Sequence, residues 1–448
     1  MTKKIKLKNV TFKRKNHVVL RDFNASFERG TMVLLTGDSG CGKSTLLRLI
    51  AGFSSLDYTG QILIDGCSYQ NLSMSEKAQK VGLVFQNPSQ QFTMRTLYNE
   101  MVFALENCGI YGDNLKFRIK EAVDFSETLD ILNQDLTTLS GGQKQRAALA
   151  VIVAVNPDVF LLDEPFASID PSSRQLLINK LAKLRDLGKT IIICDHDLNN
   201  YLNVIDIRFE VGQTGLLKTE LANAEEQVRL NSTKEVTNRL ISGSEFCLKQ
   251  GRKELISKED FTFRDGITTL TGENGTGKST FLRSIVQLHQ YQGKLFLKES
   301  RLKRSRKLYQ KISLAVQDAE KQFITLTPKE ELLFSSNDKE LNLKQQEAVA
   351  YLKLTEKLNS SIYHLSEGQK KMIQLICMLS LDLECLLLDE PFTGLDKRSC
   401  QYFVDWIKEK SKTQSFIIVT HRLTPLDGIS HHHINLADKQ FFEKVGEI

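Results

Sequence analysis

The sequence predicts an α/β protein made of two tandem domains, each built on a mostly parallel sheet. Two observations lead to this prediction. A glycine-rich stretch of the form G-x4-G-K-[ST] lies between a buried strand and a helix at 37–45, and the same pattern returns at 272–280. Further short motifs follow each stretch in the same order, and such internal repetition is typical of duplicated domains.

The first glycine-rich stretch predicts a phosphate-binding loop. The run Met32–Thr36 before it is apolar, as in a buried strand, and a helix beginning STLLRLIAG follows it. Glycines let several N–H groups point at one polyphosphate, and the helix N-terminus favours the anion. Lys43 supplies a point charge for the β and γ phosphates, and Ser44 supplies a hydroxyl for Mg2+. The predicted ligand-binding residues are Gly37, Asp38, Ser39, Gly40, Cys41, Gly42, Lys43, Ser44 and Thr45.

The composition limits the class of protein. The chain has 448 residues, of which 41% are hydrophobic and 25% charged, as in ordinary soluble globular proteins. No apolar run reaches the length of a membrane span, and no hydrophobic region follows the basic start, so we expect a cytoplasmic chain. Eight cysteines without C-x-x-C spacing predict reduced thiols and no zinc site. The net charge of +6 gives no indication of nucleic-acid binding.

Short strands surround the first loop. Ile5–Phe12 and Phe23–Phe27 alternate apolar with polar residues and predict antiparallel strands, and Gly60–Gly66 predicts another strand and turn. The buried strand that begins at Val81 ends at Gln86 and a proline stop. This end places the Gln86 amide at the edge of a site, although a simple turn residue is the alternative.

A helical region precedes the next motif. Apolar residues at three and four spacing predict helices over 96–136, and the sequence LSGGQ follows at 139–143. Ser140 can cap the helix that begins there, and the glycines expose backbone donors.

Two later strands end in residues with reactive side chains. The strand Val159–Leu162 delivers Asp163 and Glu164 to its carboxyl end, where open parallel sheets bind ligands. One carboxylate can hold Mg2+ and the other can orient a water molecule; a helix cap is the alternative. The strand Thr190–Cys194 ends near His196, which can contact a γ phosphate or can be an ordinary histidine at a strand end.

The same series of motifs occurs again in the second half. From the signature serine to the glutamate of the acidic pair the spacing is 24 residues in both copies, from 140 to 164 and from 366 to 390. We expect two domains, 1–240 and 241–448, with a polar linker at about 222–244. The predicted site residues of the second half are Gly272, Glu273, Asn274, Gly275, Thr276, Gly277, Lys278, Ser279, Thr280, Gln317, Ser366, Gly368, Gln369, Asp389, Glu390 and His421.

This ordered set of motifs, found twice, resembles the ATP-binding cassette (ABC) ATPases over nearly the whole chain. The loops Phe85–Gln91 and Val316–Gln322 further resemble the energy-coupling factor branch of that family, whose ATPases drive vitamin, thiamine-precursor or metal-ion uptake. The resemblance implies two P-loop ATPase domains, each with a parallel sheet core, an antiparallel β subdomain and a helical signature subdomain. ATP and Mg2+ are the implied ligands.

The resemblance also implies that the two halves pair head to tail around two ATP sites. The implied catalytic residues are Glu164, Glu390, His196, His421, Gln86 and Gln317, and the implied Mg2+ ligands are Ser44, Gln86, Asp163, Ser279, Gln317 and Asp389. In the first site, Ser366, Gly368 and Gln369 of the second half face the loop of the first half. In the second site, Ser140, Gly142 and Gln143 face the loop of the second half.

The resulting functional expectation is an ATP-hydrolysing subunit of a membrane importer, held peripherally on the cytoplasmic face of the cell membrane. Its implied partners are a transmembrane coupling protein and a substrate-binding membrane subunit, with no nucleic acid. A soluble tandem ATPase acting on ribosomes or DNA is the alternative, but the chain lacks the long charged linker and the C-x-x-C pairs of those relatives. A non-enzymatic scaffold is disfavoured by the lysines and glutamates present in both copies.

Three positions differ from the family pattern or carry a separate expectation. Arg14 stands where the family often stacks an aromatic ring on adenine. Glu367 replaces the first signature glycine, so it either weakens the first ATP site by charge repulsion or points to solvent. Cys41 lies near Lys43 and a helix N-terminus, a setting that predicts a lowered thiol pKa.

Two further segments are given structural interpretations. His431, His432 and His433 lie where a late strand is expected, and strand alternation puts only two rings on one face, which argues against a metal site. The basic run Arg301–Lys311 is interpreted as a solvated face, with an anionic lipid surface as the alternative.

Overall fold

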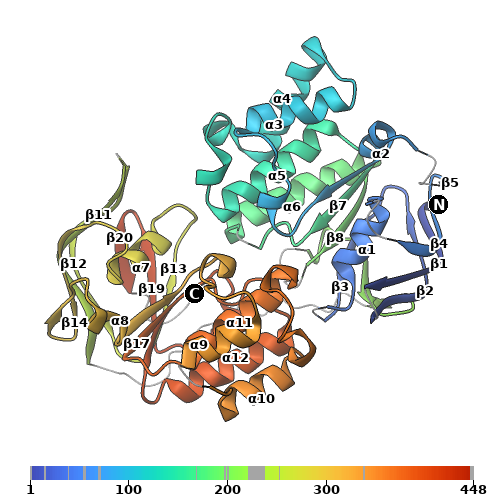
Figure 1. Ribbon diagram of the computed structural model, residues 1–448. Helices are drawn as coiled ribbons and strands as arrows, with labels where there is room; N and C mark the ends of the chain where they lie inside the picture. The colour runs from blue at the N-terminus through green and yellow to red at the C-terminus, as the bar shows by residue number, and fades with distance from the viewer. Residues whose placement is uncertain are drawn as a thin grey trace. The chain divides into compact units, whose positions relative to one another are not determined.

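The computed structural model describes residues 3–443, except for 15–16, 39, 54–56, 69–71, 168, 196–197, 199–200, 220–237, 252 and 337–338. The chain divides into two compact units, Met1–Glu225 and Glu226–Ile448 (Figure 1). The domain boundary expected at residue 240 falls within the first strand of the second unit, Arg239–Gln250, and most of the expected linker lies outside the described residues.

The first unit contains two sheets. The antiparallel sheet has the order β2-β1-β4-β5, and the second has the order β10-β9-β3-β8-β7-β6. All neighbours in the second sheet are parallel except β9 and β10. The strands are β1 (Lys3–Arg14), β2 (His17–Glu28), β3 (Met32–Thr36), β4 (Tyr58–Ile64), β5 (Cys67–Ser68), β6 (Val81–Val84), β7 (Val159–Asp163), β8 (Thr190–Cys194), β9 (Ile207–Val211) and β10 (Leu216–Thr219).

The helices of the first unit fall into two groups. The helices are α1 (Lys43–Ile50), α2 (Met74–Lys80), α3 (Leu97–Asn107), α4 (Gly112–Ser126), α5 (Gly141–Val155) and α6 (Pro171–Asp186). α1 packs with the antiparallel sheet on one face of the parallel sheet, because Leu46 and Leu47 share a core with Leu161. α5 and α6 cover the other face, where Leu149 and Ile178 pack together with residues of the sheet. Helices α3 and α4 form a smaller core with α5, at the end away from β1 and β2 (Figure 1).

The second unit repeats this topology. Its antiparallel sheet has the order β12-β11-β14-β15, and its larger sheet the order β16-β17-β18-β13-β19-β20. The strands are β11 (Arg239–Gln250), β12 (Lys253–Arg264), β13 (Ile267–Thr271), β14 (Gln292–Leu297), β15 (Ser300–Arg301), β16 (Ile312–Ala315), β17 (Cys385–Asp389), β18 (Ser415–Val419), β19 (His432–Ala437) and β20 (Gln440–Glu443). The helices are α7 (Lys278–Ile285), α8 (Arg306–Tyr309), α9 (Pro328–Ser336), α10 (Leu343–Tyr351), α11 (Glu367–Leu379) and α12 (Lys397–Lys410).

These observations confirm the predicted α/β fold class. Every residue of β7 and β17 is buried because helices or a second sheet cover both faces of the larger sheet. The expected helical region at 96–136 is two helices and short 3-10 turns. Among the described residues, no helix combines the length and the apolar character needed to cross a bilayer.

The histidine segment at 431–433 and the basic run at 301–311 have the structures predicted for them. The late strand is β19, which begins at His432. His431 Nδ1 accepts a hydrogen bond from the Ile267 N–H at 3.0 Å, and His433 Nε2 lies 2.9 Å from Thr271 Oγ1. In the basic run the charged side chains are exposed, while Leu302 and Leu308 point into the core.

One glycine in each antiparallel sheet permits a close backbone approach. Gly60 has φ +95° and Gly293 has φ +90°. A Cβ atom on Gly60 would lie 2.4 Å from the Asn9 carbonyl oxygen, and one on Gly293 would lie 2.3 Å from that of Glu245. The neighbouring residues Asn9 and Glu245 both have φ +48°, so the same irregular pairing occurs in both units.

We predict that Gly293→Ala lowers the thermal midpoint of the second unit, at a cost of about 2 kcal/mol or more, because the added methyl group meets backbone at a left-handed φ. Gly66→Ala is the matched control, since Gly66 has φ +78° but no atom lies within 4 Å of the added Cβ. Calorimetric unfolding measures the change in midpoint that each variant causes in its own unit, relative to the unmodified chain. Equal changes for the two variants would show that the close approach carries no cost.

Candidate active site

The two phosphate loops have the same geometry. Each loop leads into a helix through a left-handed glycine, Gly42 at φ 105° and Gly277 at φ 107°. Lys43 Nζ donates to the carbonyl oxygen of Gly37 at 2.7 Å, and Lys278 Nζ donates to that of Gly272 at 2.6 Å. Each ammonium group is therefore held over its own loop, ready for an anion. Ser39 lies outside the described residues.

The aspartate of each acidic pair is buried at the end of a central strand. Burial, followed by the charge of Glu164, raises the pKa of Asp163 to about 6. Burial likewise raises the pKa of Asp389, while a hydrogen bond with Ser279 opposes the shift. A matching hydrogen bond links Asp163 to Ser44.

This arrangement fits a divalent cation. Within the described part of the chain, the buried Oδ1 atom of Asp389 has no hydrogen-bond partner. An orphaned carboxylate oxygen next to a loop hydroxyl is the oxygen donor set that Mg2+ takes in P-loop enzymes. The residues therefore fit the predicted Mg2+ site.

The glutamate of each acidic pair is held by strained backbone. Glu164 has φ 46° and Glu390 has φ 49°, values that a non-glycine residue adopts only when its surroundings enforce them. Their N–H groups donate to the carbonyl oxygens of Cys194 at 2.9 Å and Val419 at 2.8 Å. Burial, followed by the charge of Asp389, raises the pKa of Glu390. A carboxylate with a raised pKa is suited to accept a proton near neutral pH.

The predicted histidine of the second unit, His421, lies beside the phosphate loop and the acidic pair. Nε2 of His421 lies 3.2 Å from Asn274 Oδ1 in the phosphate loop and 3.7 Å from Glu390 Oε1. The loop, the acidic pair and the histidine of this unit are therefore adjacent. The counterpart, His196, lies outside the described residues; its neighbour Asp195 binds Tyr201 and Arg174 at 2.8 and 3.2 Å.

The predicted glutamines begin loops that are fastened in the same way in both units. Gln91 Oε1 accepts the Phe85 N–H at 3.2 Å, and Gln322 Oε1 accepts the Val316 N–H at 3.1 Å. These bonds fix the backbone directly before Gln86 and Gln317, which follow β6 and β16. We call 85–91 and 316–322 the glutamine loops.

Two buried glutamates were missed in the sequence. Glu100 accepts the N–H groups of Thr93 and Met94 at 2.9 and 2.6 Å, and Glu331 accepts those of Ile324 and Thr325 at 3.1 and 2.9 Å. They lie in the first turns of α3 and α9 and fasten the segments that follow the glutamine loops. Their equal offset of 231 from each other, as for Gln86 and Gln317, is the signal that could have found them.

The signature residues are helix caps, as Ser140 was predicted to be. Ser140 and Gln143 form a capping box, with the Ser140 N–H donating to Gln143 Oε1 at 3.0 Å. Ser366 and Gln369 form another at the start of α11. Gly142 and Gly368 lie buried between these partners. The pairing of each signature with the opposite phosphate loop stays a prediction.

Glu367 makes an ion pair on its own helix. Its carboxylate lies 3.2 Å from Lys370 Nζ, which also pairs with Glu320. Burial alone would lower the pKa of Lys370, but the hydrogen bond with Glu320 and the charge of Glu367 raise it. The effect of Glu367 on the first ATP site stays a prediction, with much of its charge opposed by Lys370.

The adenine position has a structural counterpart in the second unit that the sequence did not reveal. Arg14 is exposed at the end of β1, where it pairs with His17 across the hairpin. Gln250 occupies the same end of β11 and pairs with Lys253. Neither Arg14 nor Gln250 carries an aromatic ring.

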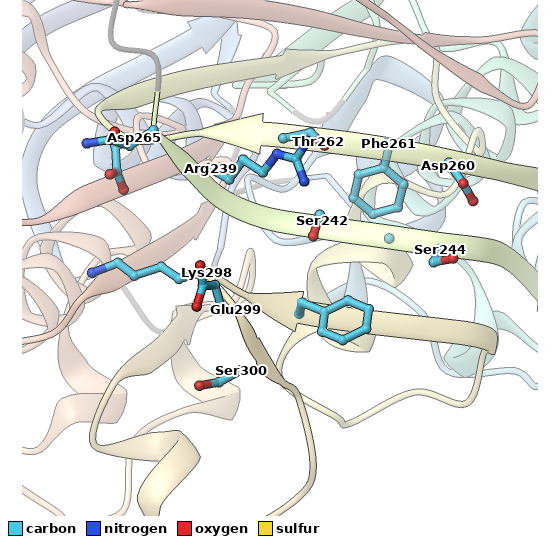
Figure 2. Close-up of a pocket in the computed structure, with 13 residues that line it drawn as sticks. Arg239, Ser242, Ser244, Asp260, Phe261, Thr262, Asp265, Lys298, Glu299 and Ser300 are labelled. Carbon is cyan, nitrogen blue, oxygen red and sulfur yellow. The ribbon is translucent and has the colours of Figure 1, made fainter.

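A hollow of about 1150 Å3 in the second unit is separate from these groups. It lies on the antiparallel sheet and is lined by Ser242, Ser244 and Thr262 of the strands and Lys298 of the β14–β15 turn (Figure 2). No residue of the second phosphate loop lines it. We therefore place the chemistry at the strand ends and not in this hollow.

The sequence model of the ABC transporter family matches residues 20–167 and 258–393. These ranges make up more than half of the chain, and the chain belongs to the ABC transporter family. It is an ATPase with two ABC domains, and it binds and hydrolyses ATP.

Known relatives include transport ATPases. The chain is 28% identical to "Putative HMP/thiamine import ATP-binding protein YkoD" of Bacillus subtilis, over 90% of this chain and 84% of that protein. It is 37% identical to "Energy-coupling factor transporter ATP-binding protein EcfA1" of Streptococcus thermophilus, over 44% of this chain and 72% of that protein.

A solved structure shares the fold along most of the chain. The archaeal ribosome recycling factor aABCE1, solved with the stalk protein aP1, has a TM-score of 0.63 and 18% identity, over 96% of this chain and 87% of that one. At this identity the likeness concerns the fold alone.

The expected lowered thiol pKa at Cys41 is wrong. Burial raises the pKa of Cys41, and the charge of Lys43 only partly opposes that shift. The sequence showed the nearby cation and the helix N-terminus but not the extent of desolvation.

We predict that iodoacetamide modifies Cys67, which is exposed, at least several-fold faster than Cys41 at pH 7.5. Because the thiolate is the reactive form, labelling of Cys41 rises as the pH increases through and beyond 9.0, the ordinary value for a thiol. Peptide mass spectrometry measures both sites, and added Mg-ATP slows Cys41 alone. Faster labelling of Cys41 than of Cys67 would contradict the raised pKa.

Proposed function

We propose that this chain is the ATP-hydrolysing subunit of a membrane importer of the energy-coupling factor type, held peripherally on the cytoplasmic face of the membrane. The observation that carries the proposal is the similarity to EcfA1 at 37% identity, together with the similarity of nearly the whole chain to a relative named for HMP/thiamine import. The first relative is named as the ATP-binding protein of a transporter, and the second as an import ATP-binding protein. A transmembrane coupling protein and a substrate-binding membrane subunit are the proposed partners.

The proposed catalytic roles are those that the family resemblance implies, and the geometry of the loops and acidic pairs described above supports them. Lys43 and Lys278 bind the β and γ phosphates, and Glu164 and Glu390 orient and deprotonate the attacking water. His196 and His421 contact the γ phosphate. Ser44, Asp163 and Gln86 would hold Mg2+ in the first unit, and Ser279, Asp389 and Gln317 would hold it in the second. The ion would neutralise charge on the phosphoryl group.

The head-to-tail pairing of the two units is part of the same proposal. Ser366, Gly368 and Gln369 then complete the first site, and Ser140, Gly142 and Gln143 complete the second. Backbone N–H groups at the N-termini of α5 and α11 suit a triphosphate. Closure around ATP and opening after hydrolysis transmit the energy, because ATP favours whichever form it binds more tightly.

An exposed apolar surface next to the second glutamine loop supports a protein partner. Ile324, Leu326 and Tyr363 are 71%, 67% and 63% exposed. Leu326 and Tyr363 belong to neighbouring segments, since the Ile362 N–H donates to the Leu326 carbonyl oxygen at 2.9 Å. Exposed apolar side chains that gather on a rigid segment are typical of interaction sites. Glu331 holds this segment in place, so we propose that it docks the membrane partner.

Copurification tests the importer proposal. The full-length chain, tagged and recovered from gently solubilised membranes, is expected to bring integral membrane proteins with it. Ile324→Ser with Leu326→Ser is expected to reduce that recovery and to leave the ATPase activity of the isolated chain within about twofold of the unmodified chain. Recovery of ribosomes or DNA in place of membrane proteins would favour a soluble tandem ATPase.

We predict that Glu164→Gln together with Glu390→Gln lowers ATP hydrolysis by about 100-fold or more, because each site loses its positioned general base. ATP binding is retained, since the lysines and backbone donors are unchanged. Steady-state phosphate release and equilibrium binding of labelled ATP measure the two properties separately. Turnover near that of the unmodified chain would contradict the assignment of these glutamates.

A further inference from the structure

Two adjacent lysines near the start of α11 are buried in the second unit. Lys370 and Lys371, in the first turns of α11, are 2% and 4% exposed. Lysine is almost never so buried unless it is paired, and a cation near a helix N-terminus is also opposed by the helix dipole. Their partners therefore indicate what they stabilise.

Apart from Glu367 on the same helix, these partners belong to the second glutamine loop or fasten it. Lys371 Nζ donates to the carbonyl oxygen of Gln317 at 2.8 Å and to Gln374 Oε1 at 3.1 Å. Gln374 Nε2 donates to the carbonyl oxygen of Val316 at 2.9 Å and to Gln322 Oε1 at 2.7 Å. Lys370 pairs with Glu320, in the middle of the loop.

The same positions of the first unit carry different chemistry. The counterparts of Lys370 and Lys371, 226 residues earlier, are Lys144 and Gln145, and that of Gln374 is Ala148. Lys144 Nζ lies 3.3 Å from Ser89 Oγ, where the second unit has the carboxylate of Glu320. Gln145 is neutral and donates to the Glu164 carbonyl oxygen at 3.4 Å. Alanine has no side-chain donor. The groups that bind the second loop therefore carry more charge than their counterparts in the first unit.

The buried charge of Lys371 also acts on the catalytic carboxylates. Burial lowers its pKa to about 8, and the charges of Asp389 and Glu390 oppose this shift more than any others. Lys371 in turn opposes the rise in the pKa of Asp389. The ammonium group of Lys371 thus binds the backbone of Gln317, and the negative charges of Asp389 and Glu390 favour its charged form.

We propose that Lys371 and Gln374 are positioning residues that fix the second glutamine loop against α11, so that Gln317 is arranged before ATP binds. The first loop has Ser89 in place of Glu320, and Gln145 stands in place of Lys371, so the first loop opens more readily. The two ATP sites are therefore unequal in their local order. The catalytic consequence rests on the proposed role of Gln317, whereas the order of the loop does not.

Hydrogen exchange of the full-length chain tests the order of each loop directly. Amides of 316–322 are expected to exchange about tenfold more slowly than those of 85–91, which corresponds to about 1.4 kcal/mol in opening free energy. Lys371→Gln with Gln374→Ala, which installs the residues of the first unit, is expected to remove most of that difference. The reciprocal change, Gln145→Lys with Ala148→Gln, is the matched control and is expected to slow exchange in 85–91.

Kinetics separate a positioning role from a purely structural one. The double variant is expected to lower kcat several-fold with KM changed less than twofold, because neither residue touches the triphosphate in the proposed site. Equal exchange of the two loops in the unmodified chain, or unchanged exchange of 316–322 in the variant, would overturn the proposal. Faster exchange throughout the second unit would also overturn it, by showing a general loss of stability.

Two further variants keep the test decisive. If the double variant does not fold, Gln374→Ala alone is measured in the same peptide, and it is expected to raise exchange about threefold; no change would overturn the proposal. Gln317→Ala with unchanged turnover but normal exchange of 316–322 would contradict the role of Gln317 and leave the ordered loop intact.

Discussion

The placement of two adjacent carboxyl groups at the end of a buried strand is the constraint on which the rest of the structure depends. The strands VFLLD and CLLLD are buried along their full length, and each ends in an aspartate followed by a glutamate. Burial raises the pKa of Asp163, Asp389 and Glu390, and the neighbouring carboxylate raises the pKa of Asp163 and Glu390 further. The arrangement is therefore stable only where cations and donors surround it. The loop lysine and the loop hydroxyl supply part of this environment, and the proposed Mg2+ would supply the rest. The order β3-β8-β7, repeated as β13-β18-β17, brings the loop to the acidic pair.

Much of this arrangement could be predicted from the sequence because its determinants are local. A glycine-rich turn, an apolar strand ending in Asp-Glu, and a serine with a glutamine three residues later each encode their geometry within a few residues. The repeat then confirms each motif against its copy. The cap at Ser140 and the strands that lead to the phosphate loops and acidic pairs needed no information beyond this.

The remaining features depend on tertiary burial, which no local pattern reveals. The predicted lowering of the Cys41 pKa was wrong because the sequence shows the cation two residues away but does not show the desolvation of the thiol. Glu100 and Glu331 read as ordinary acidic residues in a first helical turn until their carboxylates are seen to accept loop N–H groups. Lys371 reads as one more lysine in the run QKK, and only the fold shows that it points inward at the carbonyl oxygen of Gln317.

The differences between the two halves are unevenly distributed, and this distribution is informative. Four residues proposed to bind phosphate or Mg2+ or to activate water have identical counterparts in the second half: Lys43, Ser44, Asp163 and Glu164. The changes from Ser89 to Glu320, Gln145 to Lys371 and Ala148 to Gln374 all lie where the glutamine loop meets the signature helix. A charged group buried there must be matched by carboxylates or carbonyl oxygens, so these changes depend on one another. The chemistry is therefore duplicated, while the mechanical link between the loop and the helix is specific to each half.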